Sequence, residues 1–128
     1  MTRSIVVLLY LLLLLAVPAY AVDEVSDIDL CRDISIIAKE IMTARQMDKP
    51  MSETLPAAVD RFRDMVVGYK GEVDLEDTEE MTKAIAPLVM AAYDIPLWPI
   101  ESMQRNAIST FENTVFGGCY KESLDSEE

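Results

Sequence analysis

Two cysteines, Cys31 and Cys119, are the residues whose chemistry is easiest to define in this sequence. In an oxidising compartment an even number of cysteines favours pairing, whereas in a reducing compartment both side chains remain free thiols. A disulfide here would close a long loop, and the chain-entropy model assigns such a cross-link about 4 to 5 kcal/mol of stability. If the chain is exported, we therefore expect a structural disulfide between Cys31 and Cys119.

Other catalytic chemistry has few residues to draw on. The chain contains no histidine, so a Ser-His-Asp or Cys-His site is excluded, and the commonest general base is missing. Carboxylates are numerous, so a small carboxylate-dependent hydrolase stays as an alternative, although a short helical chain leaves little room for a substrate cleft. The acidic stretch at residues 72–80 lacks the glycine and the ligand spacing of a calcium loop. We expect no enzymatic activity, no cofactor and no metal site.

The first 21 residues have the layout of a secretory signal peptide. Arg3 gives a positive start, residues 5–17 form an unbroken apolar run, and Ala19 and Ala21 are the small residues that cleavage requires. As a helix this run rises about 20 Å, less than the roughly 30 Å of a bilayer's hydrocarbon core. We expect cleavage after Ala21 and a periplasmic or secreted protein without stable membrane insertion. The alternative is an uncleaved signal that tethers the chain to the inner membrane.

The charge of the chain limits the kinds of partner it can have. A formal net charge of −12 argues against nucleic acid and against anionic lipid surfaces, both of which require clustered Lys and Arg. An acidic protein is steered towards a basic one, which suggests a basic envelope protein, such as a muralytic enzyme, as the partner. Solubility in a crowded compartment is the simpler explanation of the same charge.

Helical periodicity dominates the rest of the chain, and no stretch alternates for long enough to predict a strand. Four segments repeat apolar residues at steps of three and four, which draws one apolar stripe along each helix. The stripes are Leu30, Ile34, Ile37, Ile41 and Ala44; Leu55, Val59, Phe62, Val66 and Tyr69; Met81, Ile85, Leu88 and Ala92; and Met103, Ala107, Phe111 and Val115. The pattern predicts an all-α fold, a small bundle of three to four helices closed by one disulfide.

Proline, glycine and capping residues predict where these helices begin and end. The first helix closes before Pro50, the second begins at a Ser52 or Thr54 cap, and the third begins at a capping box of Asp77 and Glu80. We expect Pro87 to bend the third helix and Gly117-Gly118 to end the fourth, leaving Cys119 just beyond it. The predicted organisation is a signal peptide at 1–21, a helical domain at 22–121 and a disordered acidic tail at 122–128.

The connector before the last helix, residues 93–99, holds the candidate contact residues Tyr93, Leu97 and Trp98. A tryptophan held between prolines loses little conformational entropy on binding, which suits an interface anchor. The alternative is that Leu97 and Trp98 fold back over the open end of the bundle and cap its core.

Two segments, residues 31–58 and 89–121, resemble a family of small exported proteins of tailed bacteriophages and prophages. The shared features are a cysteine near the mature N-terminus, an Arg-Gln pair and a Met-Ser restart, followed by Ala-Tyr, a proline and a closing cysteine. They correspond here to Cys31, Arg45-Gln46, Met51-Ser52, Ala92-Tyr93, Pro96 and Cys119-Tyr120-Lys121. The acidic linker at residues 72–77 and Pro87 depart from this pattern. The family has no established activity, so the resemblance implies a phage origin and an exported location.

These observations favour a periplasmic binding protein that acts by protein contact and is encoded by a phage or prophage. Two alternatives remain open. One is a structural or housekeeping component of the bacterial envelope, and the other is the carboxylate-dependent hydrolase considered above.

Overall fold

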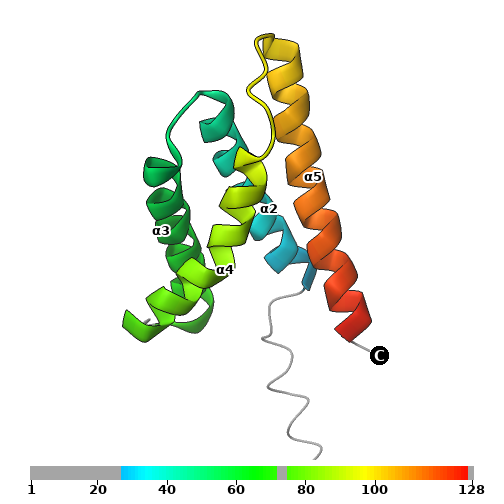
Figure 1. Ribbon diagram of the computed structural model, residues 1–128. Helices are drawn as coiled ribbons and strands as arrows, with labels where there is room; N and C mark the ends of the chain where they lie inside the picture. Colours follow the sequence, from blue (N-terminus) through cyan, green and yellow to red (C-terminus); the bar gives the residue numbers. More distant parts are fainter. Residues whose placement is uncertain (1–26, 72–74, 127–128) are drawn as a thin grey trace, which may run out of the picture.

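The computed structural model describes residues 27–71 and 75–126, and this part of the chain contains four α-helices and no strand. They are α2 (Asp27–Gln46), α3 (Met51–Lys70), α4 (Leu75–Tyr93) and α5 (Glu101–Ser126). Successive helices run in opposite directions along the bundle (Figure 1). The predicted all-α bundle is therefore confirmed. The predicted signal peptide lies outside the described residues.

Helix α2 is the centre of the bundle, because it packs against each of the other three helices. Helices α3 and α4 also pack against each other, whereas α5 packs chiefly along α2 and stands to one side of that pair (Figure 1). The buried core confirms the predicted stripes of the first three helices in part, and it draws a single residue from α5. Its members are Ile37, Ala38, Ile41, Met42, Ala58, Val59, Ile85, Val89, Ala92 and Phe111.

Helix α3 begins in a way that the sequence did not predict. Pro50 occupies the N-cap position with an extended backbone and no capping side chain, so the prediction of a Ser52 or Thr54 cap is wrong. Proline suits this end of a helix because its fixed φ is compatible with the turn that follows. Thr54 is instead only 5% exposed, and its hydroxyl lies beside the hydroxyl of Tyr93, the last residue of α4. Gly71 ends the helix with a φ of 87°.

Helix α4 begins at Leu75, two residues before the predicted start, and the side chain of Asp77 lies outside the described part. Pro87 lies inside the helix on its exposed side. A proline removes one backbone hydrogen bond, but an exposed carbonyl one turn earlier can bond to water instead. The helix therefore continues through Pro87 to Tyr93 and carries Val89 and Ala92 into the core.

Helix α5 differs most from its prediction. It continues through Gly117-Gly118 to Ser126, so the predicted end at the glycines is wrong and residues 122–126 are helical rather than a disordered tail. Its inward face is also rotated from the predicted one. Phe111 and Val115 reach the core, but Met103 is 38% exposed, and Ile108 packs inward instead.

The two glycines inside α5 should be replaceable with a gain in stability. A Cβ atom added at either position would meet no side chain or neighbouring helix within 4 Å, and neither glycine has a positive φ. Glycine is less favourable than alanine in a helix by about 1 kcal/mol. We expect Gly117→Ala and Gly118→Ala each to raise the free energy of unfolding by about 0.5 to 1 kcal/mol in urea denaturation at low protein concentration.

Gly71 provides the matched control for that prediction. Its φ of 87° lies in the region that residues with a side chain avoid, although the space around it is open. Gly71→Ala should therefore lower the free energy of unfolding by about 1 kcal/mol or more. A loss of stability in either α5 variant would show that the glycines relieve a close contact or strain within the fold.

A disulfide between Cys31 and Cys119 ties the start of α2 to the last third of α5. The two Cα atoms lie 5.6 Å apart, which is within the normal range for a disulfide. Cys119 lies inside the helix rather than beyond its end, and Cys31 is almost completely buried. The predicted pairing is therefore confirmed, and it holds α5 against α2 at the end of the bundle opposite the connector.

Polar contacts also join the surfaces of α2 and α3. Tyr69 donates its phenolic hydrogen to the carboxylate of Asp33, and this hydrogen bond raises the pKa of Tyr69 above its usual value. Arg61 and Glu40 form a bidentate ion pair with both nitrogen–oxygen distances at 2.9 Å. Both pairs are exposed, so each contributes little to the free energy of unfolding.

Candidate functional site

The connector, which the structure places at residues 94–100 between α4 and α5, is held by a buried glutamine at the end of α2. Gln46 is 7% exposed, and its amide nitrogen donates to the carbonyl of Pro96 at 3.0 Å. Its amide oxygen accepts the backbone N–H of Trp98, also at 3.0 Å. Gln104 of α5 completes the attachment by donating to the carbonyl of Trp98 at 2.7 Å. The backbone of the connector is therefore fixed from both sides.

Arg45 and Tyr93 extend this attachment. The Nε atom of Arg45 donates to the carbonyl of Ile95 at 3.1 Å, and its guanidinium lies 5.1 Å from the centre of the Tyr93 ring. The Tyr93 hydroxyl donates to the carbonyl of Lys49 and lies 2.7 Å from the hydroxyl of Thr54. Tyr93, which was predicted as a contact residue, is thus committed to holding the ends of three helices together.

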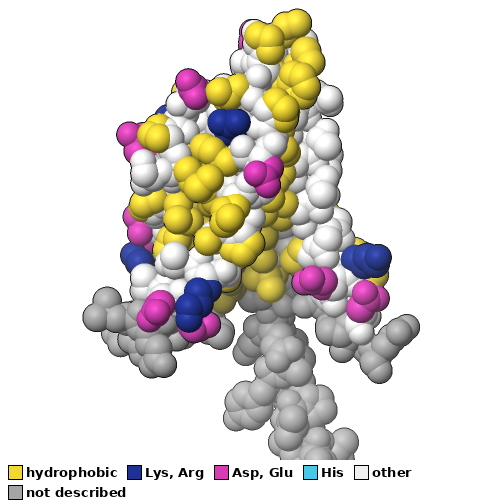
Figure 2. Space-filling model, viewed as in Figure 1, with side chains coloured by type: hydrophobic (Ala, Val, Ile, Leu, Met, Phe, Trp, Pro, Cys, Tyr) yellow, Lys and Arg dark blue, Asp and Glu magenta, His cyan; other side chains and the backbone are white. Residues whose placement is uncertain are grey.

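Two apolar side chains of the connector remain exposed although its backbone is fixed. We call Leu97 and Ile100 the connector surface, and they are 39% and 56% exposed. The acidic residues Asp94 and Glu101 flank them in the sequence, and both are exposed. Figure 2 shows hydrophobic side chains gathered at this end of the molecule, whereas most charged side chains in that view lie lower. Because the backbone is fixed, covering these side chains would cost little conformational entropy.

A groove runs from the connector down between α4 and α5. It encloses about 460 Å³ and is lined by apolar and uncharged polar side chains. Trp98 lies in its wall and is half-buried, so it does fold back towards the bundle while Leu97 is exposed to solvent. Figure 2 shows a strip of hydrophobic side chains between the two helices. The lining includes Ala91, Ile95, Trp98, Met103, Ala107 and Phe111.

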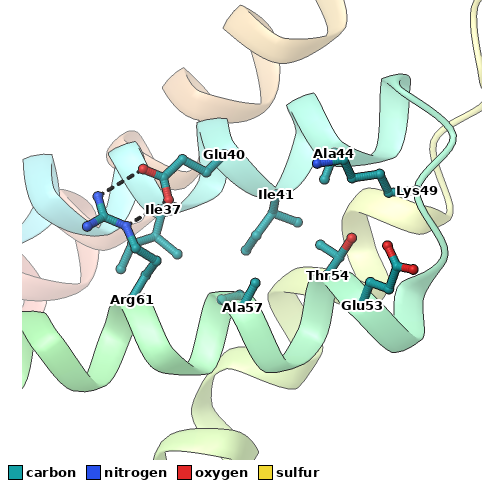
Figure 3. A pocket seen from close by; sticks show the side chains of 10 residues that line it. Ile37, Glu40, Ile41, Ala44, Lys49, Glu53, Thr54, Ala57 and Arg61 are labelled. Atoms are coloured by element: carbon teal, nitrogen blue, oxygen red, sulfur yellow. Dashed lines mark hydrogen bonds and ion pairs between the residues drawn. The ribbon is translucent and has the colours of Figure 1, made fainter.

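A second hollow of about 330 Å³ lies between α2 and α3. Figure 3 shows Ile37, Ile41 and Ala57 along its walls, with the Arg61–Glu40 ion pair at one end and Lys49 at the other. The hydrogen bond to Glu40 raises the already high pKa of Arg61, so this arginine stays positively charged. The charges of Arg61 and Glu40 are exposed and neutralise one another, and Lys49 and Glu53 also line this hollow.

The described residues contain neither a group of metal-binding side chains nor a free thiol. No group of three or more His, Cys, Asp or Glu side chains is placed to hold a metal ion within residues 27–71 and 75–126. Both cysteines are in the disulfide, and no buried side-chain nitrogen or oxygen of this part lacks a hydrogen-bond partner. No described helix is both long enough and apolar enough to span a membrane.

The sequence identified the connector but missed the residues that hold it. Leu97 is exposed and Trp98 is half-buried, so these two predicted contact residues lie on different sides of the loop. Arg45 and Gln46 stand out in the sequence only through the family resemblance, and nothing distinguishes Gln104 or Ile100 from their neighbours. A polar pair at the end of a helix, followed by a short loop, is the one available signal for a side chain that binds backbone.

Comparisons with protein-family models, with curated protein sequences and with solved structures find no match to this chain.

Proposed function

We propose that this chain is an exported protein of the bacterial periplasm, encoded by a phage or prophage, that acts by contact with another protein. The observation that carries the proposal is the connector surface. Leu97 and Ile100 stay exposed on a loop whose backbone is fixed by Gln46 and Gln104. An apolar contact that is already rigid loses little conformational entropy when a partner covers it.

The charge of the chain supports a basic partner. The formal net charge is −12, and Asp94 and Glu101 stand exposed at the two ends of the connector. Such a field speeds encounter with a basic protein, while the apolar side chains supply the close contact. A basic envelope protein, such as a muralytic enzyme that the phage must restrain, has the required chemistry.

The direct test is capture of the partner from an envelope extract. The full-length gene is expressed with a C-terminal tag, and the purified product is used as the cell leaves it, with mass spectrometry recording its N-terminus. We expect one basic protein to be retained, and Leu97→Ala to weaken its binding about tenfold, as for an anchor residue at an interface. Retention should fall as salt rises.

Leu124→Ala is the matched control, because Leu124 is 48% exposed but lies near the other end of α5. It should bind as the wild type does. The proposal fails if no envelope protein is retained, if retention is independent of salt, or if the two leucine variants lose binding equally. Flanking lysis or tail genes would support the phage origin, and flanking chromosomal envelope genes would support a housekeeping component.

A further inference from the structure

Leu97 differs from its neighbours in the connector because its own backbone groups have no partner. Gln46 binds the carbonyl of Pro96 and the N–H of Trp98, and Gln104 binds the carbonyl of Trp98. Within the described residues, neither the N–H nor the carbonyl of Leu97 takes part in a hydrogen bond. Leu97 is 39% exposed, and backbone groups at such a position are normally bonded to water. Its side chain and both backbone groups are therefore available to another protein.

The backbone around Leu97 is extended. A residue that precedes a proline avoids the helical region, so Ile95 and Trp98 are restricted to extended conformations. Each proline also fixes its own φ at about −65°, which is compatible with an extended chain. The structure agrees, since it shows no turn, bend or helix between Ile95 and Pro99. Leu97 thus lies in an extended segment whose neighbours cannot easily leave that conformation.

This segment has the features by which endopeptidases bind their substrates. Extended peptides are bound through main-chain hydrogen bonds, which give affinity, and through side-chain pockets, which give specificity. In an endopeptidase the S1 pocket takes the side chain that precedes the bond to be cleaved, and Leu97 offers an apolar one. The connector rises from the end of α4 to the start of α5 at one tip of the molecule, so it can enter a cleft (Figure 1).

We propose that the connector is a substrate-like inhibitory loop, which occupies the cleft of an endopeptidase with Leu97 in its S1 pocket. This inference rests on the proposed contact through the connector surface and narrows the partner to one class of enzyme. Asp94 is exposed at the start of the connector, and its carboxylate has no ion-pair partner among residues 27–71 and 75–126. It can therefore pair with a basic group beside the cleft.

Gln46 explains why such a loop would inhibit the enzyme instead of being consumed. Hydrolysis adds one water molecule across the Leu97–Trp98 peptide bond, which gives a carboxylate on Leu97 and an amine on Trp98. The Gln46 side chain bridges this bond, because it binds Pro96 before it and Trp98 after it. Gln104 holds Trp98 a second time. Both new ends therefore stay side by side in the cleft, where the bond can re-form with loss of the same water.

The rest of the bundle gives the loop the rigidity that tight inhibition requires. Proteases and their protein inhibitors bind with backbone shifts of about 1 Å or less, so the loop must already have its bound shape. The carbonyls of Ile95, Pro96 and Trp98 are each bound by a side chain of α2 or α5. These are the two helices that the disulfide joins. The elements that hold the loop are thus themselves cross-linked.

The test exchanges the side chain that an S1 pocket would recognise. The purified product of the full-length gene is mixed with chymotrypsin, whose S1 pocket takes apolar side chains, and with trypsin, whose S1 pocket takes basic ones, while hydrolysis of a chromogenic peptide is followed. We expect the wild type to inhibit chymotrypsin competitively, raising the apparent KM with kcat unchanged, and to leave trypsin active. Leu97→Lys should reverse this preference and change the ratio of the two inhibition constants by about a hundredfold or more.

Ile100→Lys is the matched control, because it adds the same charge to the connector surface but outside the segment that Gln46 bridges. It should keep the preference for chymotrypsin. Gln46→Leu provides a second measurement, by mass spectrometry of the chain after exposure to chymotrypsin. Without the bridge, the bond between Leu97 and Trp98 should be cut about tenfold faster or more. A variant that merely unfolds would be cut at many bonds instead of this one.

The inference is overturned if the wild type does not inhibit chymotrypsin and Leu97→Lys does not inhibit trypsin, or if the two lysine variants behave alike. These outcomes are distinct from failure of the proposed function. An envelope partner that is retained through Leu97 but is not an endopeptidase would leave the proposed function standing and remove this inference. Inhibition of chymotrypsin without any retained envelope protein would establish the inhibitory loop and remove the envelope partner.

Discussion

Replacing Cys31 and Cys119 together by alanine is expected to lower the free energy of unfolding by about 4 to 5 kcal/mol. The disulfide closes a loop with a sequence separation of 88 residues, and a long loop gains most conformational freedom when it is opened. This loss is large beside the roughly 5 to 15 kcal/mol of a typical domain. The loss of local stability should be largest in α5, because α5 packs chiefly along α2, the helix that carries Cys31.

The measurement is urea denaturation followed by circular dichroism on the oxidised wild type and on the double alanine variant. The reduced wild type is the control, and it should unfold at nearly the same urea concentration as the variant, since both lack the cross-link. A difference between oxidised and reduced protein of less than about 1 kcal/mol would mean that packing between α2 and α5 is sufficient to hold them together.

Much of the fold could be predicted from local patterns. The apolar stripe of α2 predicted Ile37 and Ile41 in the core, because helical periodicity fixes which side chains share a face. Two cysteines in a chain with the layout of an exported protein predicted their pairing, which the structure confirms. These features depend on residues that are close in sequence or on the cysteine count alone.

The residues of α5 alone do not predict which of its faces packs against the core. Phe111 and Val115 belong to two stripes, one that includes Met103 and Ala107 and another that includes Ile108. The disulfide contained the missing information. Counting back from Cys119 by two steps of four and one of three leads through Val115 and Phe111 to Ile108, which is the face that the structure turns towards the core. A cross-link thus predicts helix orientation as well as proximity.

The prediction that α5 ends at Gly117-Gly118 was wrong because the low helix propensity of glycine is a small effect. A glycine in a helix is unfavourable by only about 1 kcal/mol relative to alanine. Continuing the helix places Cys119 beside Cys31 and keeps Val115 against the core, and together these contacts outweigh two such penalties. The start of α3 was wrong for a similar reason, because Pro50 already provides a backbone suited to the first turn.

The partner of Gln46 in the connector could not be predicted from the sequence. Gln46 and Trp98 are 52 residues apart, and nothing in either segment predicts that one amide side chain will bond to the backbone of the other. The consequence for function is direct. The backbone on both sides of the exposed Leu97 is bound by a buried polar side chain on another helix, so the connector is rigidly joined to the bundle.

Gln46→Leu is therefore expected to lower the free energy of unfolding by about 2 to 3 kcal/mol and to free the connector. Leucine has a similar size but leaves the Pro96 carbonyl and the Trp98 N–H without their partner, and each such loss costs about 1 to 3 kcal/mol in a buried setting and less where water has access. Gln104→Leu removes one hydrogen bond to the same loop and should cost about 1 kcal/mol.

Hydrogen exchange separates this local effect from a general loss of stability. In the wild type the Trp98 amide is hydrogen-bonded to Gln46 and should exchange slowly, whereas in Gln46→Leu it should exchange much faster than amides in the middle of α2. Trp98 is the single tryptophan of the chain, so its fluorescence should shift to longer wavelength as the loop opens to water. Equal protection of the Trp98 amide in both proteins would show that the loop keeps its shape through its apolar contacts alone, and that Gln46 adds stability without positioning Leu97.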